Sequence, residues 1–231
     1  MEIKVVFEDN RILVVEKPQG MLTQSDISES EDLLTILKKY IKEKYNKPGN
    51  VYLGLVHRLD RETGGVMVFA RTSKSAASLS RQIRERSFKK NYLAVLEGTI
   101  DDKKGELRDF VLKDSNKNLV SIVDKETLNA QEAILEYEVL SEKEDLTLVK
   151  INLKTGRSHQ IRVQFSNRGN PVLGDGKYGS LSKKEMALWS YKIAFNHPSL
   201  KKEVIFEVIP PKIYPWNLFS ETLQTQLAIQ K

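Results

Sequence analysis

The sequence predicts an α+β fold in which helices flank a large, mostly antiparallel mixed sheet. Short β-type runs of apolar residues recur along the 231-residue chain, and three follow one another between residues 119 and 153, as in an antiparallel meander. Stretches with helical apolar spacing lie between such runs. No repeat, low-complexity tract or linker interrupts the pattern. We therefore expect a single domain over residues 1–231.

The N-terminal part of the chain predicts a hairpin, a helix and two strands. β-type runs over residues 4–7 and 12–15 are joined by Asp9-Asn10, a pair that favours a tight turn. Ser28 to Glu31 has the pattern of a capping box, and apolar residues at helical spacing follow it. A helix is therefore expected from about residue 31 to 45, and strands over 52–56 and 65–71.

Two further helices are predicted where a serine precedes helical spacing. One runs from Ser73 to about residue 86, and its small residues, such as Ala76, predict close packing against a sheet. The other runs from Ser158 to about residue 167. The remaining elements are a C-terminal helix over 215–229 and strands over 91–96, 119–123, 133–140, 146–153, 189–195 and 203–209.

The net charge of +6 is unevenly distributed. Residues 57–92 carry 9 Lys/Arg and 3 Asp/Glu, and residues 154–179 carry 5 and 1, whereas residues 93–153 carry 8 and 14. Such clustering is typical of a surface that binds a polyanion, with the acidic segment directed elsewhere. The alternative is that these basic segments are simply solvated helix faces.

Composition disfavours several classes of protein. No apolar run approaches the roughly 18 residues of a membrane helix, and the N-terminus lacks the pattern of a signal peptide, so we expect a soluble cytoplasmic protein without membrane association. There is no cysteine, and three histidines make a metal site improbable. The glycine-rich residues 173–179 lack the Lys-Ser/Thr of a P-loop, which disfavours nucleotide hydrolysis.

The most informative stretch is HRLDRETGG, residues 57–65, which lies between two β-type runs. Its single aspartate, Asp60, lies between Arg58 and Arg61, and two glycines allow the backbone to turn tightly. Loops carried by rigid strands often hold catalytic residues. Spacing alone is equally compatible with a β-turn in which the aspartate bonds its own backbone.

Four segments together resemble the RluA family of RNA pseudouridine synthases. HRLDRETGG resembles the family's HRLDxxTSG motif, although Gly64 replaces the usual serine. FKKNYLA (88–94) resembles its K-x-Y-x-A segment, and TGRSHQIR (155–162) with GNPVLGD (169–175) resembles TGRxHQIR…GxPxxGD. KPQG (17–20) resembles a K-P-x-G segment near the family's active site. The resemblance spans roughly residues 11 to 210.

This resemblance implies the pseudouridine synthase fold with an active-site cleft, and an isomerase that needs no cofactor. Asp60 would be the catalytic residue, Arg162 its basic partner and Tyr92 the ring that stacks on uracil. Whether Asp60 forms a covalent adduct or removes a proton in the glycal route stays open. Candidate RNA-binding residues are Arg58, Arg61, Arg84, Lys89, Lys90, Arg157 and His159, the last two beside a helix start that could hold an anion.

The implied partner is a ribosomal or transfer RNA, and the protein is expected to act as a monomer. The family's short members lack an S4-like domain, and the K-P-x-G segment begins near residue 17, so target choice would come from the catalytic domain. A non-catalytic RNA-binding module is the main alternative, but it would not need Asp60, Tyr92 and Arg162 together. A hydrolase using Asp60 with His57 or His159 is disfavoured because no serine or cysteine nucleophile lies nearby.

Overall fold

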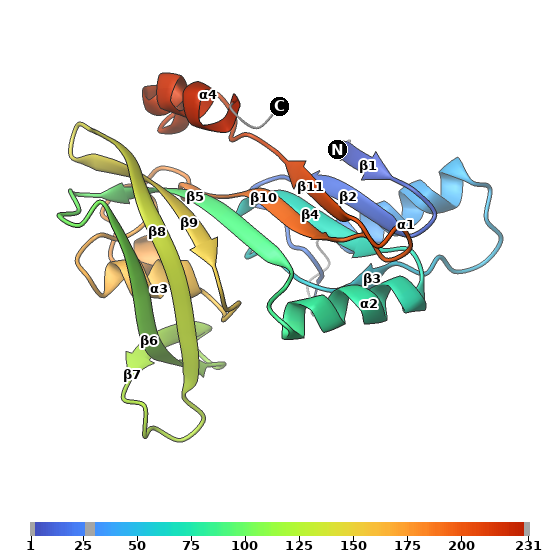
Figure 1. Cartoon of the computed structure of the whole chain (residues 1–231), viewed down its shortest axis with the longest axis horizontal. Helices are drawn as coiled ribbons and strands as arrows, with labels where there is room; N and C mark the ends of the chain where they lie inside the picture. The colour runs from blue at the N-terminus through green and yellow to red at the C-terminus, as the bar shows by residue number, and fades with distance from the viewer. Residues whose placement is uncertain (1–2, 26–30, 229–231) are drawn as a thin grey trace. The chain divides into compact units, whose positions relative to one another are not determined.

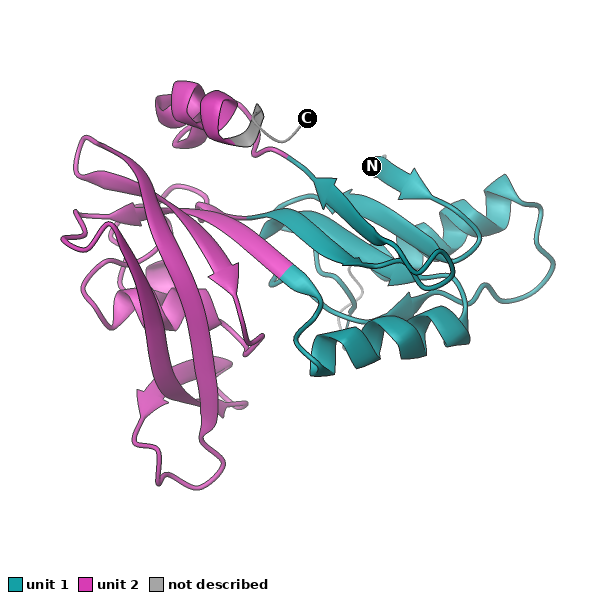
Figure 2. Cartoon of the chain, viewed as in Figure 1, with its two compact units in different colours: residues 1–89, 190–208 teal, residues 90–189, 209–231 magenta. Residues whose placement is uncertain are grey.

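The computed structural model describes residues 3–25 and 31–228, and the chain divides into two compact units (Figure 2). The first unit comprises residues 1–89 and 190–208, and the second comprises residues 90–189 and 209–231. Both units combine strands with helices, which confirms the α+β class. Within the described ranges, no helix has both the length and the apolar character needed to cross a membrane.

The sheet of the first unit is built around two largely apolar strands, β2 and β4 (Figure 1). The strand order is β1-β2-β4-β10, with β3 beside β4 and β11 beside β10. Every residue of β4 and the first four residues of β2 are buried, so these central strands pack on both faces. The bounds are β1 (Val5–Glu8), β2 (Ile12–Lys17), β3 (Gly54–Leu55), β4 (Gly64–Ala70), β10 (Leu188–Asn196, in this unit from residue 190) and β11 (Glu203–Glu207).

The turn of the β1–β2 hairpin forms where Asp9-Asn10 predicts it. The Asp9 carboxylate accepts hydrogen bonds from the backbone N–H groups of Arg11 and Ile12, at 2.7 and 2.8 Å. An aspartate side chain that binds the backbone two and three residues ahead replaces a backbone partner and stabilises the turn. The hairpin prediction is confirmed.

Helix α1 (Leu33–Lys44) confirms the first predicted helix, with a different cap. Asp32 accepts a hydrogen bond from Thr35 N at 2.8 Å and occupies the N-cap. The predicted capping box began at Ser28, and residues 28–30 lie outside the described residues. The buried positions of α1 are Leu33, Leu34, Leu37 and Ile41.

Helix α2 (Ser73–Arg84) packs against β3 and β4 of the same unit. Thr72, and not the predicted Ser73, occupies the N-cap and accepts a hydrogen bond from Ser75 N at 3.1 Å. A Cβ atom placed on Gly54 of β3 would lie 3.1 Å from Ala76 Cβ. The predicted close approach of a small-residue helix face is therefore confirmed.

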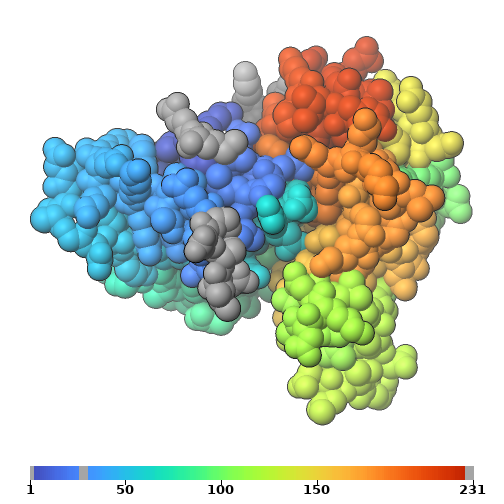
Figure 3. All heavy atoms as spheres, turned by 180° about the vertical axis from the view of Figure 1, so that it is seen from behind, coloured from blue at the N-terminus to red at the C-terminus, as the bar shows by residue number. Residues whose placement is uncertain are grey.

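The second unit carries an antiparallel sheet in the order β5-β9-β8-β6-β7. Its core includes Leu93–Leu96 of β5, which have no exposed surface. The turns around β7 form a projecting lobe, drawn in light green in Figure 3. The bounds are β5 (Lys89–Glu97, in this unit from residue 90), β6 (Lys104–Asp114), β7 (Leu119–Val123), β8 (Gln131–Lys143) and β9 (Leu146–Leu153).

Strand β6 was not predicted, because its sequence alternates charged with apolar residues. The structure shows that these charges pair across strands: Arg108 Nη1 lies 2.6 Å from a Glu132 oxygen, and Lys104 Nζ lies 2.7 Å from a Glu138 oxygen. Opposite charges on facing strands favour pairing. The acidic middle segment is thus partly neutralised within its own sheet.

The helices of the second unit are shorter than predicted. Helix α3 is confined to Gln160–Ser166, and Ser158 does not cap it. Instead His159 occupies the N-cap in a left-handed conformation, with φ of 48° and no side-chain cap hydrogen bond. The predicted C-terminal helix divides into a 3₁₀ turn, η2 (Trp216–Phe219), and α4 (Ser220–Ala228), whereas residue 229 lies outside the described residues. A second 3₁₀ turn, η1, covers Gly176–Tyr178.

Candidate active site

Asp60 begins a tight turn between β3 and β4 of the first unit. Its backbone oxygen accepts a hydrogen bond from Thr63 N at 3.1 Å, and Thr63 is buried. After Gly64, which begins β4, Gly65 has φ of +117°, and a Cβ atom there would lie 2.1 Å from the backbone oxygen of Ser190. Only glycine fits this position, so the sheet itself fixes the exit of the turn.

The side chains on this turn alternate between the interior and the solvent. Arg58 and Arg61 are exposed, Leu59 is buried and Asp60 is half-buried. The backbone oxygen of Leu59 accepts a hydrogen bond from Thr23 Oγ1 at 2.9 Å. The turn therefore presents a partly desolvated carboxylate with one cation before it and one after it, as its sequence predicts.

The Lys17 side chain binds the backbone of this turn. The sequence had not assigned a role to this residue. Its side chain has no exposed surface, and its ammonium donates to the backbone oxygens of Pro18, Met21 and Arg61, at 2.9, 2.6 and 3.0 Å. Burial lowers the pKa of Lys17 to about 8, although the carboxylates of Glu62 and Asp60 act to raise it. The KPQG match was the available signal.

The rest of the KPQG segment also contacts the turn. Gly20 N donates to the Arg61 oxygen at 2.9 Å, and Arg61 Nε donates back to the Gly20 oxygen at 3.0 Å. Gln19 Nε2 donates to the Glu62 oxygen at 3.0 Å. Residues 17–20 therefore hold the backbone of Arg61 and Glu62, the two residues that follow Asp60, in place.

His57 supports the other end of the same loop. The backbone pairing of β3 with β4 ends at Leu55 and Phe69, and beyond it Val68 N donates to His57 Nε2 at 3.1 Å. The imidazole thus takes the place of a strand carbonyl and lets the chain leave the sheet. Since Nε2 is the acceptor, the ring is neutral and carries its proton on Nδ1.

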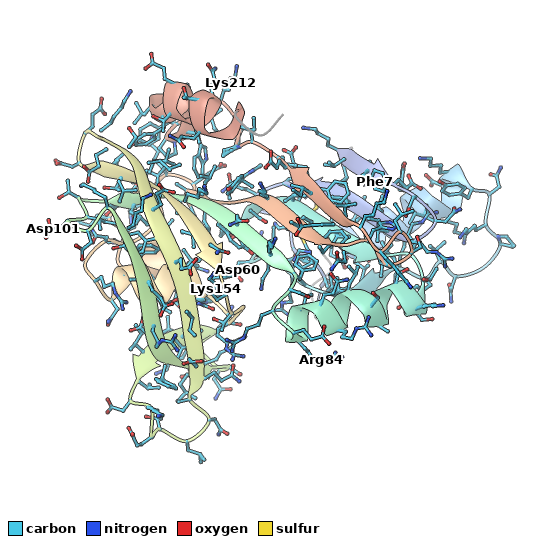
Figure 4. All side chains as sticks on the ribbon, viewed as in Figure 1. Phe7, Asp60, Arg84, Asp101, Lys154 and Lys212 are labelled. Atoms are coloured by element: carbon cyan, nitrogen blue, oxygen red, sulfur yellow. The ribbon has the colours of Figure 1, made fainter. Side chains whose placement is uncertain are left out.

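The cations at the end of α2 lie on the surface of the first unit. Arg84 ends the helix and is exposed (Figure 4). Lys89 is also exposed, and its ammonium lies 2.7 Å from a Glu203 oxygen. An exposed ion pair of this kind contributes little free energy, so Lys89 can exchange its partner for a phosphate.

Arg162 lies on α3 of the second unit, where it is buried. Its Nε and Nη2 atoms donate to the two carboxylate oxygens of Asp175, at 2.6 and 2.8 Å. The guanidinium carbon also lies 5.0 Å from the centre of the Tyr178 ring. Sequence reasoning gave no role to Asp175 or Tyr178, and the GNPVLGD match was the only available signal for Asp175.

Tyr178 connects Arg162 to His159 and to β7. Its hydroxyl accepts a hydrogen bond from Val120 N at 2.9 Å and lies 2.8 Å from His159 Nδ1. Because the hydroxyl accepts from Val120, its own proton is available to His159 Nδ1. His159 is buried, and its Nδ1 edge is thus held inside the second unit.

The three other predicted residues lie on β5 and on the loop after β9. Tyr92 is a buried residue of β5 opposite Ile151 of β9. Lys90 and Arg157 are half-buried, and burial, together with the nearby Arg157 guanidinium, lowers the pKa of Lys90.

The structure therefore groups the predicted residues within each unit. Asp60 belongs to the first unit, whereas Tyr92 and Arg162 belong to the second, so the pairing of Asp60 with Arg162 stays a prediction.

Comparison with known proteins gives consistent matches. A family model described as RNA pseudouridylate synthase matches residues 11–167. An RNA pseudouridine synthase from Aquifex aeolicus, described as uncharacterized, is 35% identical over 93% of this chain and 72% of its own length. The ribosomal large subunit pseudouridine synthase D of Borreliella burgdorferi is 31% identical over 83% of this chain and 60% of its own length. This chain thus spans less than two thirds of the second relative.

Solved structures show the same fold. Human RNA Pseudouridylate Synthase Domain Containing 4 superposes with a TM-score of 0.77 over 97% of this chain and 93% of its own, at 22% identity. Human RNA Pseudouridylate Synthase Domain Containing 1 gives a TM-score of 0.72 over 96% of this chain and 95% of its own, also at 22% identity. The predicted fold is confirmed.

Proposed function

Because this chain belongs to the RNA pseudouridylate synthase family, we propose that it isomerises particular uridines of a structured ribosomal or transfer RNA to pseudouridine, with Asp60 as the catalytic nucleophile. One observation carries the assignment of Asp60: it is a half-buried carboxylate on a turn that Lys17, Gly65 and His57 fix from three sides. A carboxylate held this rigidly can be aimed at a reacting carbon. The name of the Borreliella relative supports ribosomal RNA as the substrate class.

The reaction breaks the bond between uracil N1 and ribose C1′, rotates the base and joins C5 to C1′. The proton lost from C5 is matched by the one gained at N1, so the isomerisation is balanced without a redox partner. Asp60 would either attack to form a covalent adduct or remove a proton in the glycal route. In both routes the carboxylate must be ionised.

Arg162 is the proposed partner of that carboxylate. A guanidinium close to a carboxylate favours the ionised form, and Asp175 already fixes the plane of this guanidinium through two short hydrogen bonds. Asp175 accepts from two of the five N–H donors of Arg162, so the same guanidinium can also donate to a second carboxylate. Tyr92 would stack on the detached uracil while it rotates.

RNA binding is assigned to the exposed cations of the first unit and to the basic loop of the second. Arg58 and Arg61 flank Asp60 and can contact the phosphates beside a flipped nucleotide, and Arg84 extends this surface to the end of α2. Extruding a uridine from a helix costs a few kcal/mol, which favours targets in loops. Arg157, His159, Lys89 and Lys90 complete the set.

The decisive experiment is Asp60→Asn, assayed by tritium release from RNA labelled at uracil C5. The amide keeps the size of the side chain but removes its charge and nucleophilicity, so turnover should become undetectable while RNA affinity stays within about threefold. Glu43→Gln, an exposed carboxylate on α1, is the matched control and should remain fully active. Pseudouridine formed by purified Asp60→Asn would refute the assignment.

Variants of Arg162 test the partnership. Arg162→Met should be severely impaired, Arg162→Lys should retain part of the activity, and the loss in a double variant with Asp60→Asn should not exceed that of Asp60→Asn alone.

Because the isomerisation needs no redox or nucleotide partner, turnover on a short hairpin should persist in a chelator. We further propose that the chain acts as a monomer, which light scattering during turnover would test.

A further inference from the structure

Lys90 carries a half-buried ammonium for which the structure offers no counter-charge. Across residues 3–25 and 31–228, its Nζ atom has neither a hydrogen-bond acceptor nor an ion-pair partner. Burial and the nearby guanidinium of Arg157 lower the pKa of Lys90. Burial thus disfavours the charged form of Lys90, and an anion bound beside the ammonium would favour it.

The loop after β9 is shaped to receive this ammonium. A Cβ atom placed on Gly156 would lie 2.7 Å from Lys90 Nζ, so the absence of a side chain at this position makes room for the lysine. The φ of Gly156 lies outside the left-handed region that favours glycine. A side chain at this position would displace the Lys90 ammonium, whereas the backbone conformation itself does not demand glycine.

Side chains on both sides of Gly156 fix the loop. Thr155 Oγ1 accepts a hydrogen bond from Ile134 N at 2.8 Å and donates to Gln160 Oε1 at 2.8 Å. The same Gln160 oxygen accepts a hydrogen bond from Arg157 N at 3.1 Å. Thr155 and Gln160 are both buried, so the loop is held in place before any ligand binds.

Arg157 is oriented by one edge of its guanidinium. Its Nε atom donates to the backbone oxygen of Glu132 at 2.9 Å, which leaves the two Nη groups to face another acceptor. The carboxylate of Glu132 does not neutralise it, because that carboxylate is paired with Arg108 at 2.6 Å. Lys90 and Arg157 thus form a fixed pair of like charges.

We propose that Lys90 and Arg157 together bind one backbone phosphate of the RNA, at a subsite beside Gly156. A phosphodiester has one negative charge and two non-bridging oxygens, which matches one ammonium and one pair of Nη groups. The subsite rests on the function proposed above and deepens it, since it assigns two cations to a single phosphate. Both residues belong to the second unit. In the sequence, Lys90 lies shortly before Tyr92, and Arg157 lies shortly before Arg162.

The first test replaces single phosphates of a short hairpin substrate with neutral methylphosphonates and uses the unaltered protein. One linkage should stand out, with affinity reduced about tenfold more than at neighbouring linkages. With Lys90→Met, the same replacement should have little further effect, because the cation that recognised the charge is gone. A uniform response at every linkage, or a Lys90→Met protein that keeps the full sensitivity, would overturn the subsite.

The second test measures how RNA affinity depends on salt. Lys90→Met, Arg157→Met and Gly156→Ala should each lower the slope of log affinity against log salt, by up to about 0.7 to 0.9 for the loss of one phosphate contact. The double variant Lys90→Met with Arg157→Met should lower it by no more than either single variant, since both residues serve one phosphate. Lys104→Met, an exposed lysine of the same unit that pairs with Glu138, is the control and should leave the slope unchanged.

The outcomes separate this inference from the proposed function. If the unaltered protein forms pseudouridine and no linkage stands out in the methylphosphonate scan, the subsite is refuted and the function stands. If one linkage stands out and the protein forms no pseudouridine in any RNA, the subsite stands and the function is refuted. Lys90→Arg keeps the charge and should retain most of the linkage preference, so its failure to do so would also count against the subsite.

Discussion

The guanidinium of Arg162 and the carboxylate of Asp175 form a bidentate ion pair that is almost completely buried. The two hydrogen bonds measure 2.6 and 2.8 Å, and the side chains of the two residues are 8% and 1% exposed. A charged pair removed from water in this way is costly to break, because each partner would be left desolvated alone. Asp175 therefore determines where the guanidinium of Arg162 can lie.

Asp175→Asn should impair both stability and turnover. The amide leaves Arg162 without its buried counter-charge, so the free energy of unfolding should fall by about 3 to 5 kcal/mol. Single-turnover pseudouridine formation should fall by about 100-fold or more with little change in RNA affinity, since the change affects the proposed partner of Asp60 and not a phosphate contact. Asp124→Asn, an exposed position in the same unit, should alter neither property. A stable and fully active Asp175→Asn protein would show that Arg162 does not depend on this pair.

Substitutions at Tyr178 should separate its hydroxyl from its ring. Tyr178→Phe removes the hydroxyl that accepts from Val120 N and lies against His159 Nδ1, so the free energy of unfolding should fall by about 1 to 3 kcal/mol. Turnover should stay near the unaltered level, because the ring under Arg162 remains. Tyr178→Leu removes the ring as well and should lower turnover a further tenfold or so. Urea unfolding and single-turnover assays on both variants would check this order, and equal turnover in the two would contradict a role for the ring.

Lys17 should make stability depend on pH above neutrality. Burial lowers its pKa from 10.5 to about 8 in the folded protein, so between these values the unfolded chain binds the proton more tightly. The free-energy cost of holding this ammonium is therefore fully present below about pH 8 and disappears as the pH rises to about 10.5. The corresponding gain in the free energy of unfolding is up to about 3 kcal/mol.

This pH dependence can be isolated by comparison with Lys17→Met. The variant lacks the titrating group, so from about pH 7.5 to about pH 10.5 the difference in stability should move in favour of the unaltered protein. Urea titrations at both pH values would measure it, with Lys38→Met, an exposed lysine on α1, as the control that shows no such change. A difference between Lys17→Met and the unaltered protein that is the same at both pH values would contradict the assignment.

His57 should matter as a hydrogen-bond acceptor and not as a base. His57→Leu leaves the Val68 N–H group without its acceptor, which should lower the free energy of unfolding by about 1 to 3 kcal/mol and loosen the Asp60 loop. His57→Gln supplies an amide oxygen and should restore part of the stability and of the turnover. Urea unfolding of both variants would measure this, and equal stability of His57→Leu and His57→Gln would argue against the role.

Much of this protein can be predicted from the local sequence, because local patterns have local causes. Asp9 forms the hairpin turn through bonds to residues two and three positions ahead, and the apolar runs of β2 and β4 are central strands because nothing polar in them needs water. The stretch from His57 to Thr63 forms a loop between strands, and the two glycines that follow it begin β4. The resemblance of four segments also identified the fold that the comparisons confirm.

The remaining features depend on residues that only the folded chain brings together. The N-caps of α2 and α3 lie one residue from their predicted positions; in α2 the Thr72 hydroxyl, and not that of Ser73, accepts from the first turn. Strand β6 escaped prediction because its charges are matched by β8 across the sheet. Lys17 reads as a surface residue, yet it is fully buried because backbone oxygens from residues 18, 21 and 61 surround its ammonium. Arg162 and Asp175 are 13 residues apart, and no spacing rule joins them. The sequence thus determined which side chains are candidates for the chemistry, whereas the tertiary structure decided which backbone groups and counter-charges hold them in place, since desolvation and hydrogen-bond partners exist only after distant segments have packed.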